Sequence, residues 1–461
     1  MAPASLTNLR IPGGWQRGRR AIMVALIGVA LLSSLAALWL QLSAQPNSSR
    51  SPLQATTLPR DSGPGDQGAN QTSAIDRLVR KAQSSANARP TDPEAQSQLG
   101  FAFLQAARET ADPSAYGRAE LAFNAAIALD PANVDALIGQ GSLALSRHEF
   151  RSALDFGQRA LALNPSIAST YGVIADAQIE LGRYPDAIRT VQHMVDLRPD
   201  IASYSRVSYL RELHGDLDGA IQAMEKAVSA AGPASENTEY VRVQLGNLYF
   251  SVGRIDDAQL TYQRSLVALP NFRYALRGLA RVEAARGNLP GAIDLYQRAT
   301  AQVPLPELLI GLGEAMQANG QPVDAADQYA LVEAEQRLFA ANGVRTDLEL
   351  ASFFADHGDP LQAVTLAIAA YRERPSVFGA DTLAWALHRA GRSQEAALYL
   401  AQALRLGTRD SRILYHAGMI EIALGEIDAA RDHLQAALAL NPAFSPLDAT
   451  RAEQALEGLG R

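Results

Sequence analysis

Small and apolar residues recur along most of this chain at a nearly constant spacing. In nine successive units a small residue is followed twelve positions later by an alanine, from Gly141 with Ala153 to Gly418 with Ala430. Successive alanines are 33, 34 or 38 residues apart. A period of this length is typical of units made of two helices, here called A and B, that stack into a solenoid. Because helix axes approach to about 8 Å only over small side chains, we expect these residues to meet where A crosses B.

Glycine and proline mark the ends of these helices. In eight units a glycine lies five residues before the helix B alanine: Gly182, Gly215, Gly253, Gly287, Gly320, Gly358, Gly391 and Gly425. Glycine at that point supplies the left-handed conformation that ends helix A. Proline closes six units and stops helix B, at Pro165, Pro199, Pro270, Pro304, Pro375 and Pro442.

The chain on either side of these units predicts one further helix at each end. Residues 74–88 and 444–460 place apolar side chains on one helical side, and a repeat array needs such caps to cover its terminal apolar faces. We therefore expect a capping helix in 74–92, a solenoid over 93–442 and a second capping helix in 443–461. Three places depart from the register: seven extra residues around 110–114, and junctions lengthened by about four residues near 232–238 and 339–344.

The pattern resembles that of the tetratricopeptide repeat (TPR) family. Residues 244–249 read QLGNLY and are followed by Ala258, Tyr262 and Pro270, which matches the Leu-Gly-x-x-Tyr of helix A, the Ala and aromatic of helix B and the closing Pro of that family. The resemblance covers about residues 93–442, or about ten repeats. It implies an all-α, right-handed α-solenoid whose concave face, lined by the A helices, binds a protein or peptide. The protein that the resemblance suggests is a membrane-anchored bacterial member of this family.

The N-terminal region predicts a membrane anchor. Residues 21–42 are 22 positions without a charge, preceded by Arg10, Arg17, Arg19 and Arg20 and by no acidic residue. About 20 apolar residues span a bilayer core, and positive charge favours the cytoplasmic side. We expect a cytoplasmic basic tail, 1–20, a single transmembrane helix, 21–42, and repeats outside the cytoplasm. A cleaved signal peptide is the alternative, although the run is longer than usual for one. Residues 43–73, rich in Pro, Ser, Gly, Asn and Gln, predict a disordered, flexible linker.

Composition and motifs argue against other classes of function. The formal net charge of −7 does not fit a nucleic-acid-binding surface, which needs a basic footprint. The chain has no cysteine, so it has neither a thiol nucleophile nor a cysteine metal site. It contains no phosphate-binding loop, no dinucleotide fingerprint and no HExxH. We therefore predict no catalytic residue, no metal ligand and no cofactor, and we expect that the protein is not an enzyme.

The register of helix A predicts which side chains face a peptide. With the repeats numbered so that Gly141 lies in repeat 2, the expected groove residues of repeats 4 to 6 are Tyr209, Asn247, Phe250, Tyr274, Arg277 and Arg281. Arginine binds carboxylate with two parallel hydrogen bonds, so this groove suits an acidic segment or a C-terminus. Arg277 and Arg281 are similar to the basic pair in the carboxylate clamp of chaperone-binding repeats. The alternative is a solvated arginine stripe.

A second, more aromatic patch is expected in repeat 9, with Phe378 and Trp385. Exposed tryptophan beside arginine is a common interface anchor, and the alternative is that Trp385 packs into the next repeat as core. Together these features favour a membrane-tethered interaction scaffold or assembly factor that presents a peptide-binding groove outside the cytoplasm. A regulatory or sensing subunit of an envelope complex is a second hypothesis, and a repeat-bearing enzyme is a third and less favoured one.

Overall fold

The computed structural model describes residues 73–232 and 235–460, and all regular structure in these ranges is α-helical. The predicted transmembrane segment, 21–42, and the predicted linker up to residue 72 lie outside the described residues. In the described ranges, none of the helices combines the length and the apolar character needed to cross a bilayer. The helices are α2 (Ala74–Ala88), α3 (Pro93–Thr110), α4 (Ser114–Leu129), α5 (Val134–Ser146), α6 (Phe150–Leu163), α7 (Ala168–Glu180), α8 (Tyr184–Leu197), α9 (Ile201–Leu213), α10 (Leu217–Ser229), α11 (Glu236–Phe250), α12 (Ile255–Ala268), α13 (Arg273–Ala285), α14 (Leu289–Thr300), α15 (Pro306–Ala318), α16 (Pro322–Ala341), α17 (Asp347–His357), α18 (Pro360–Glu373), α19 (Val377–Arg389), α20 (Ser393–Ala403), α21 (Ser411–Leu424), α22 (Ile427–Leu440) and α23 (Asp448–Leu459).

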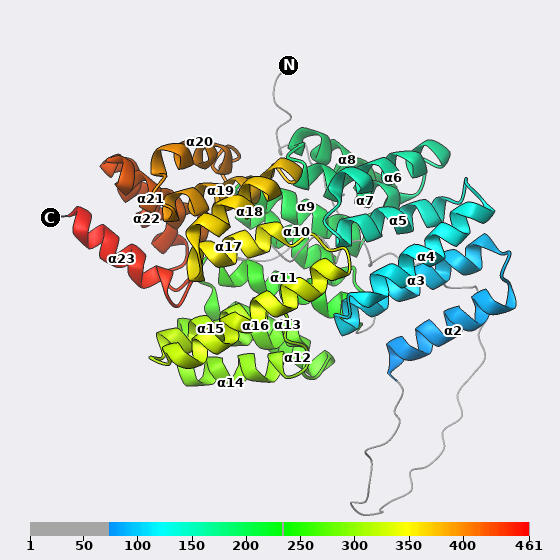
Figure 1. Ribbon diagram of the computed structural model, residues 1–461, viewed down its shortest axis with the longest axis horizontal. Coiled ribbons are helices and arrows are strands. Elements are labelled where there is room, and N and C mark those ends of the chain that lie inside the picture. The colour runs from blue at the N-terminus through cyan, green and yellow to red at the C-terminus, as the bar shows by residue number, and fades with distance from the viewer. Residues whose placement is uncertain (1–72, 233–234, 461) are drawn as a thin grey trace, which may run out of the picture.

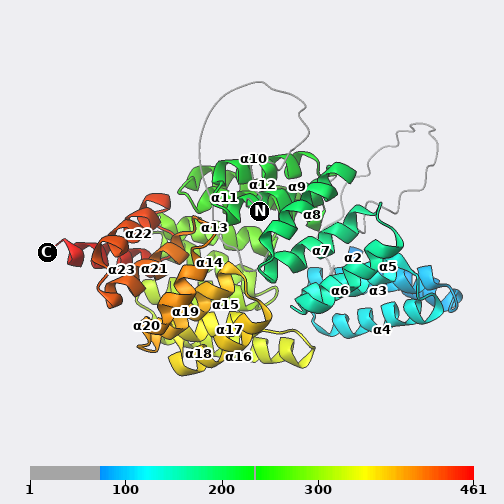
Figure 2. The same cartoon turned by 90° about the horizontal axis from the view of Figure 1, so that it is seen from above.

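Ten consecutive helix pairs, from α3 with α4 to α21 with α22, form the array, and α2 and α23 lie at its opposite ends (Figures 1 and 2). The expectation of an all-α repeat array is therefore confirmed. Polar side chains cap the helices where the chain enters them: Asn133 accepts a hydrogen bond from the backbone N–H of Ala136 (2.7 Å), and Asp410 accepts from those of Arg412 and Ile413. Such caps satisfy N–H groups that have no partner within the helix.

The crossings of helices A and B confirm the role expected of the small residues. Each of the nine helix B alanines exposes at most 1% of its surface. At one crossing the Ser208 hydroxyl donates to the carbonyl oxygen of Ala220 at 2.7 Å. At another, a Cβ added to Gly246 would lie 2.5 Å from the ring of Tyr262. The helices are therefore too close for larger side chains at these positions.

The turn between A and B has the expected left-handed residue in most repeats. Seven of the eight predicted glycines have positive φ, between 69° and 81°. Gly358 is the exception, with φ −135° and ψ −144°, so its repeat ends helix A differently. In repeat 2 the left-handed position is occupied by His148, with φ 60°.

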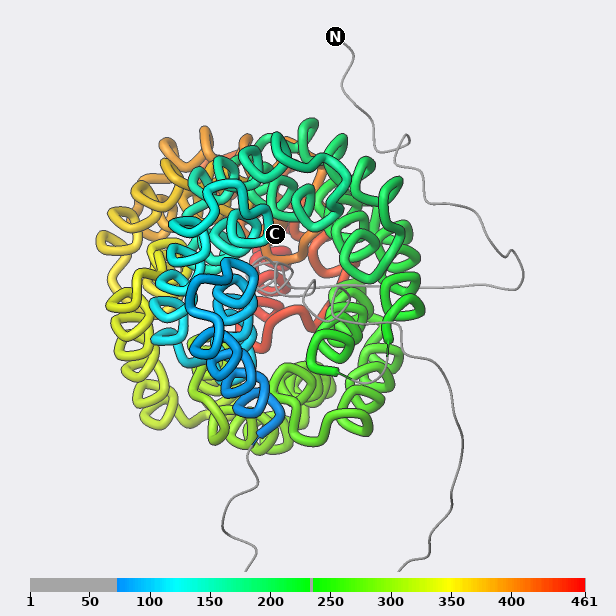
Figure 3. Tube along the Cα trace, turned by 90° about the vertical axis from the view of Figure 1, so that its right-hand side faces the viewer, coloured from blue at the N-terminus to red at the C-terminus, as the bar shows by residue number. Residues whose placement is uncertain are grey.

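Viewed along its long axis, the array forms a ring (Figure 3). Turns that are far apart in sequence touch along a line that we call the seam. Across it the Val377 N–H donates to the Tyr184 hydroxyl (2.8 Å), the Thr408 hydroxyl donates to the Leu213 carbonyl (2.5 Å) and Asn441 Nδ2 donates to the Phe250 carbonyl (2.7 Å). The paired residues are 191 to 195 residues apart. The A–B turns of early repeats thus pack against the junctions that close later repeats.

A buried ion pair strengthens the seam. The guanidinium of Arg374 bonds the Glu180 carboxylate and, at 3.2 Å, that of Glu349. The side chains of Arg374 and Glu180 are 5% and 1% exposed. Burial by itself lowers the pKa of Arg374, but the two adjacent carboxylates raise it above its ordinary value.

All three departures from the repeat register lie where the array contacts itself. Ala111, in the extra segment of repeat 1, packs against a cluster containing Leu276 and Leu308. Arg108, just before that segment, pairs with Glu236 in the first lengthened junction. In the second, the Arg345 N–H donates to the carbonyl oxygen of Arg147 at 3.1 Å. The extra residues therefore build non-local contacts and do not simply loosen the solenoid.

Candidate functional site

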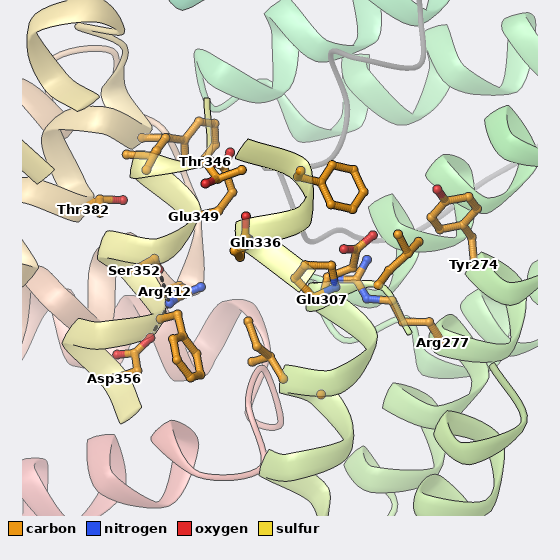
Figure 4. A pocket seen from close by; sticks show the side chains of 18 of the residues that line it. Tyr274, Arg277, Glu307, Gln336, Thr346, Glu349, Ser352, Asp356, Thr382 and Arg412 are labelled. Carbon is orange, nitrogen blue, oxygen red and sulfur yellow. Dashed lines mark hydrogen bonds and ion pairs between the residues drawn. The ribbon is translucent and has the colours of Figure 1, made fainter. Parts of the chain in front are cut away.

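The seam encloses part of the concave face, and a cavity of about 420 Å³ lies inside. Its walls come from α3 to α5, from α13 to α17, from α19, from α21 and from the segment that leads into the first residue of α23. Figure 4 shows Tyr274, Arg277 and Glu307 on one side and Ser352, Asp356 and Arg412 on the other. Ligand pockets in proteins commonly have volumes of about 300–1,000 Å³, so the cavity is large enough for a small molecule or a few residues of peptide.

One wall of the cavity carries arginine and tyrosine side chains. The guanidinium of Arg281 lies 4.0 Å above the ring of Phe250. Burial lowers the pKa of Arg281 to about 10, and the positive charge of Arg277 acts in the same direction. Burial likewise raises the pKa of Tyr116 to about 12. At neutral pH this wall therefore presents charged guanidinium groups and neutral phenols, all of which can donate hydrogen bonds.

The opposite wall is a network of paired charges. Asp356 accepts hydrogen bonds from Trp385 Nε1 (2.7 Å) and from Arg412 Nη2 (2.6 Å). Burial favours the neutral carboxyl, but the charge of Arg412 and two histidines outweigh it and lower the pKa of Asp356. Next to this pair, His416 Nδ1 lies 3.0 Å from Asp381 Oδ1. These side chains satisfy one another, so this wall is held rigid by its own contacts.

Four of the predicted binding residues line the cavity: Tyr274, Arg277, Arg281 and Phe378. The structure therefore brings together the arginine pair of repeat 6 and one aromatic residue of repeat 9, which the sequence analysis had assigned to separate patches. Binding by any of them stays a prediction.

The other four residues are buried, so the exposed groove position that was expected for three of them, Tyr209, Asn247 and Phe250, is wrong. Tyr209, Phe250 and Trp385 are 2%, 1% and 3% exposed, and Asn247 is 9% exposed. Asn247 accepts a hydrogen bond from the Tyr262 hydroxyl at 2.8 Å and donates to Gln244. Phe250 lies under Arg281 at the seam.

The burial of the other two has equally specific causes. Tyr209 belongs to a core cluster with Tyr184 and Val377, so the later turn of the array covers it, and burial raises its pKa well above the ordinary value. Trp385 stacks on His416 of the next repeat, with ring centroids 4.1 Å apart and an interplanar angle of 10°. The alternative that Trp385 packs as core is the one the structure supports.

Several wall residues were not expected from the sequence, among them Arg108, Tyr116, Glu307 and Gln336. Arg108 and Tyr116 belong to repeat 1, and they reach the cavity because the array returns on itself. The departures from the repeat register near 110–114, 232–238 and 339–344 were the available signal, since each lies close to one of these contacts.

Comparisons with known proteins support the repeat assignment. A tetratricopeptide repeat family model matches residues 104–166, 173–236, 243–305 and 382–443, together more than half of the chain. Cellulose synthase 1 operon protein C of Komagataeibacter xylinus is 25% identical over 267 residues, which are 58% of this chain and 18% of that protein. The Arabidopsis thaliana Protein CTR9 homolog is 22% identical over 218 residues, 45% of this chain and 20% of that protein. The chain thus spans about a fifth of the length of these curated relatives.

Two solved structures are similar to this chain at low sequence identity. The APC/C hetero-tetramer Cut9-Hcn1 is 17% identical with a TM-score of 0.36, and the similarity covers 83% of this chain and 82% of that one. A thermophilic TPR protein of Thermus thermophilus is 20% identical with a TM-score of 0.36, covering 46% of this chain and 100% of that one.

Proposed function

Because the chain belongs to the tetratricopeptide repeat family, whose members are generally scaffolds for protein–protein interaction and typically not enzymes, we propose that it binds a peptide segment of a partner protein inside its closed array. The cavity of about 420 Å³, with Tyr274, Arg277 and Phe378 on its walls, is the observation that carries this proposal. The seam turns the concave face inward, so an extended segment or a chain end reaches it more readily than the surface of a folded domain does.

The partner segment is expected to carry acidic side chains or to place its C-terminal carboxylate in the cavity. Arg277 and Arg281 project from one side of α13, because residues four apart share a helix face. Charged donors in a partly buried site bind carboxylates more strongly than neutral donors do. Salt screens charges on an exposed surface over about 10 Å at 0.1 M but screens enclosed ones less, so capture of the partner should persist at moderate ionic strength.

The cellular setting belongs to the same proposal. Residues 21–42 would hold the protein in the cell membrane with residues 1–20 in the cytoplasm, and the repeats would act outside it as a scaffold or assembly factor. The uncharged run after four arginines is what supports this topology. Protease added to spheroplasts should digest the repeats. Repeats that stay intact until lysis would contradict the orientation without bearing on the cavity.

Site-specific photo-crosslinking tests the binding site directly. A photoreactive residue replacing Phe378, on the cavity wall, should capture the partner in cells, whereas one replacing Val267, which is 85% exposed on α12, should not. Arg277→Ala/Arg281→Ala should reduce capture at Phe378, and Arg264→Ala, at an exposed position of α12, should leave it unchanged. Equal capture from both photoreactive positions would contradict binding in the cavity.

A further inference from the structure

The outward face of α16 carries large apolar side chains that face solvent. Val323 is 75% exposed, Leu331 48% and Leu338 49%. Of the helices in 73–232 and 235–460, α16 exposes the most side chains of this kind. Figure 2 shows α16 at the outer edge of the array. Because apolar surface gathered on one face of a soluble protein marks an interaction site more often than single exposed residues do, this face is a candidate contact.

The opposite face of α16 packs on the array in the ordinary way. Ala325, Val332 and Gln336 are 1%, 0% and 5% exposed, and Gln336 lines the cavity. Residues four or seven apart share one side of a helix, so these three mark the inner face and Val323 lies opposite to it. A surface helix normally turns polar side chains outward. Packing within one chain therefore accounts for the inner face of α16 but not for its apolar outer face.

The outward residues follow the spacing of a helix that pairs with another helix. Positions separated alternately by four and three residues are exposed along α16: Val323, Asp327, Ala330, Ala334, Arg337 and Ala341. Such alternation keeps one stripe of side chains facing a partner helix. Alanines within this outer stripe allow two helix axes to approach to about 8 Å. The helix has 20 residues and, at about 1.5 Å per residue, is about 30 Å long.

The outer stripe is complementary to itself when two copies of α16 run antiparallel. With the pair centred on residue 332, each residue lies opposite the partner residue that is equally far from 332 on the other side. Ala330 then lies opposite the partner's Ala334, and Asp327 lies opposite the partner's Arg337. Two-fold symmetry repeats each contact, so two ion pairs flank a close alanine contact. This arrangement of charges favours a second copy of the chain over an unrelated apolar helix.

The residues beside the outer stripe fit the same arrangement. Arg337 pairs with Glu333 on its own helix at 3.6 Å, with side chains 72% and 45% exposed, and such an exposed pair contributes little to stability. A guanidinium has five N–H donors, so Arg337 can keep Glu333 and also bind the partner's Asp327. On the other side of the stripe, Leu331 lies one residue from the centre and would contact the partner's Leu331.

From these observations we infer that two copies of this chain associate through the outer face of α16, as an antiparallel helix pair with its two-fold axis at the level of Val332. The inference goes beyond the proposed function, because it concerns the face of α16 that points away from the cavity. Each copy keeps its own cavity, so the pair presents two. A single helix pair falls at or below the low end of the range of about 1,200–2,000 Å² that specific interfaces bury, and we therefore expect association at micromolar concentrations.

Charge reversal tests the pairing directly. The full-length chain is followed by sedimentation equilibrium in a density-matched detergent, where the wild type should dimerise. Asp327→Arg and Arg337→Asp each place like charges opposite one another twice, and each should weaken the dimer roughly tenfold or more. The double variant Asp327→Arg/Arg337→Asp should restore it. An equimolar mixture of the two single variants should also form dimers, because in the mixed pair every reversed charge meets an opposite one.

Matched substitutions on α12 serve as controls. Leu331→Glu should abolish the dimer, whereas Leu260→Glu, at a position that is 46% exposed, should leave it unchanged. The chain has no cysteine, so Ala330→Cys/Ala334→Cys introduces the only two thiols, and each would face the other thiol of the partner. Mild oxidation should link these chains into a covalent dimer. Gln263→Cys/Val267→Cys, also four residues apart and exposed, should stay monomeric under the same conditions.

Three results would overturn the inference: a wild type that stays monomeric at hundreds of micromolar, a dimer that persists in Leu331→Glu, or single charge variants that associate no better when mixed than alone. A dimer that persists in Leu331→Glu would place the association elsewhere in the chain. Photo-crosslinking at Phe378 reports on the cavity independently, so the failure of the dimer would leave the proposed function standing.

Discussion

Alanine substitution at Gly215, compared with the same change at Gly287, isolates the contribution of the seam. Both glycines end an A helix in the left-handed conformation, with φ +75° and +79°. They differ in their surroundings. A Cβ at Gly215 would lie 2.4 Å from the carbonyl oxygen of Gly407 across the seam, whereas nothing lies within 4 Å of a Cβ at Gly287. The two variants therefore share the backbone strain and differ in the contact.

The expected magnitudes follow from this difference. Alanine in the left-handed region costs about 1–2 kcal/mol at either site. At Gly215 the obstacle is a backbone oxygen, which cannot rotate aside, so overpacking adds about 1–3 kcal/mol. Moving the Gly407 segment also weakens the neighbouring hydrogen bond from Thr408 to Leu213, worth about 0.5–1.5 kcal/mol. Gly215→Ala should therefore reduce the free energy of unfolding by about 1.5–4.5 kcal/mol more than Gly287→Ala does.

Denaturant unfolding measures the loss, and hydrogen exchange locates it. Because repeat arrays need not unfold in one step, exchange should be followed in peptides covering 404–411 and the end of α9. Both regions should exchange faster in Gly215→Ala, and neither should change in Gly287→Ala. Equal losses of stability in the two variants, with unchanged exchange in 404–411, would refute the argument that the seam is a stabilising contact.

Three further changes test other parts of the structure. Arg374→Met leaves the buried Glu180 carboxylate without its cationic partner and should lower the free energy of unfolding by about 3–5 kcal/mol in a denaturant titration. The double variant Glu180→Gln/Arg374→Met should recover most of this loss. Equal losses in the single and double variants would exclude an unpaired buried charge as the cause. Burial and the nearby Asp410 raise the pKa of Glu212 from 4.5 to about 8. The stability that the protonated Glu212 contributes is therefore complete below pH 4.5 and is lost as pH rises through 8. Glu212→Gln should flatten the fall in melting temperature over that pH range, and an unchanged slope would contradict the raised pKa. Ala258→Leu, at a fully buried crossing, should lose about 1–3 kcal/mol, with faster exchange centred on α11 and α12; unchanged exchange there would contradict the crossing.

The regular part of the fold could be predicted because its determinants are local. Ser208 and Ala220 meet within one helix pair, and the glycine that ends helix A lies between them in sequence. Close crossing, a left-handed turn residue and a closing proline each act over a few residues, and their repetition makes the pattern unmistakable. The helix over 74–88 was predicted with the bounds that the structure has for the same reason, since one amphipathic stretch between breakers is enough.

The cavity could be predicted only in part. The register of helix A predicts a groove position for Tyr274 and Arg277, and both line the cavity, because their placement depends on the stacking of neighbouring repeats. It placed Tyr209 and Phe250 there too, and both are buried. Their covering residues come from a later turn of the array, and no periodic pattern of one repeat contains information about a contact almost 200 residues away.

What the sequence determined by itself is the repeat unit: two helices, their crossing, their turn and the order in which the units stack. What only the tertiary structure decided is the curvature summed over many units, which brings Glu180 to Arg374 and the first repeat to the sixth. Each junction rotates the next repeat by a small angle set by side-chain packing, and the sum of these angles decides whether later turns touch earlier ones. Closure of the array, and with it the cavity that Arg108 and Arg277 share, follows from that sum.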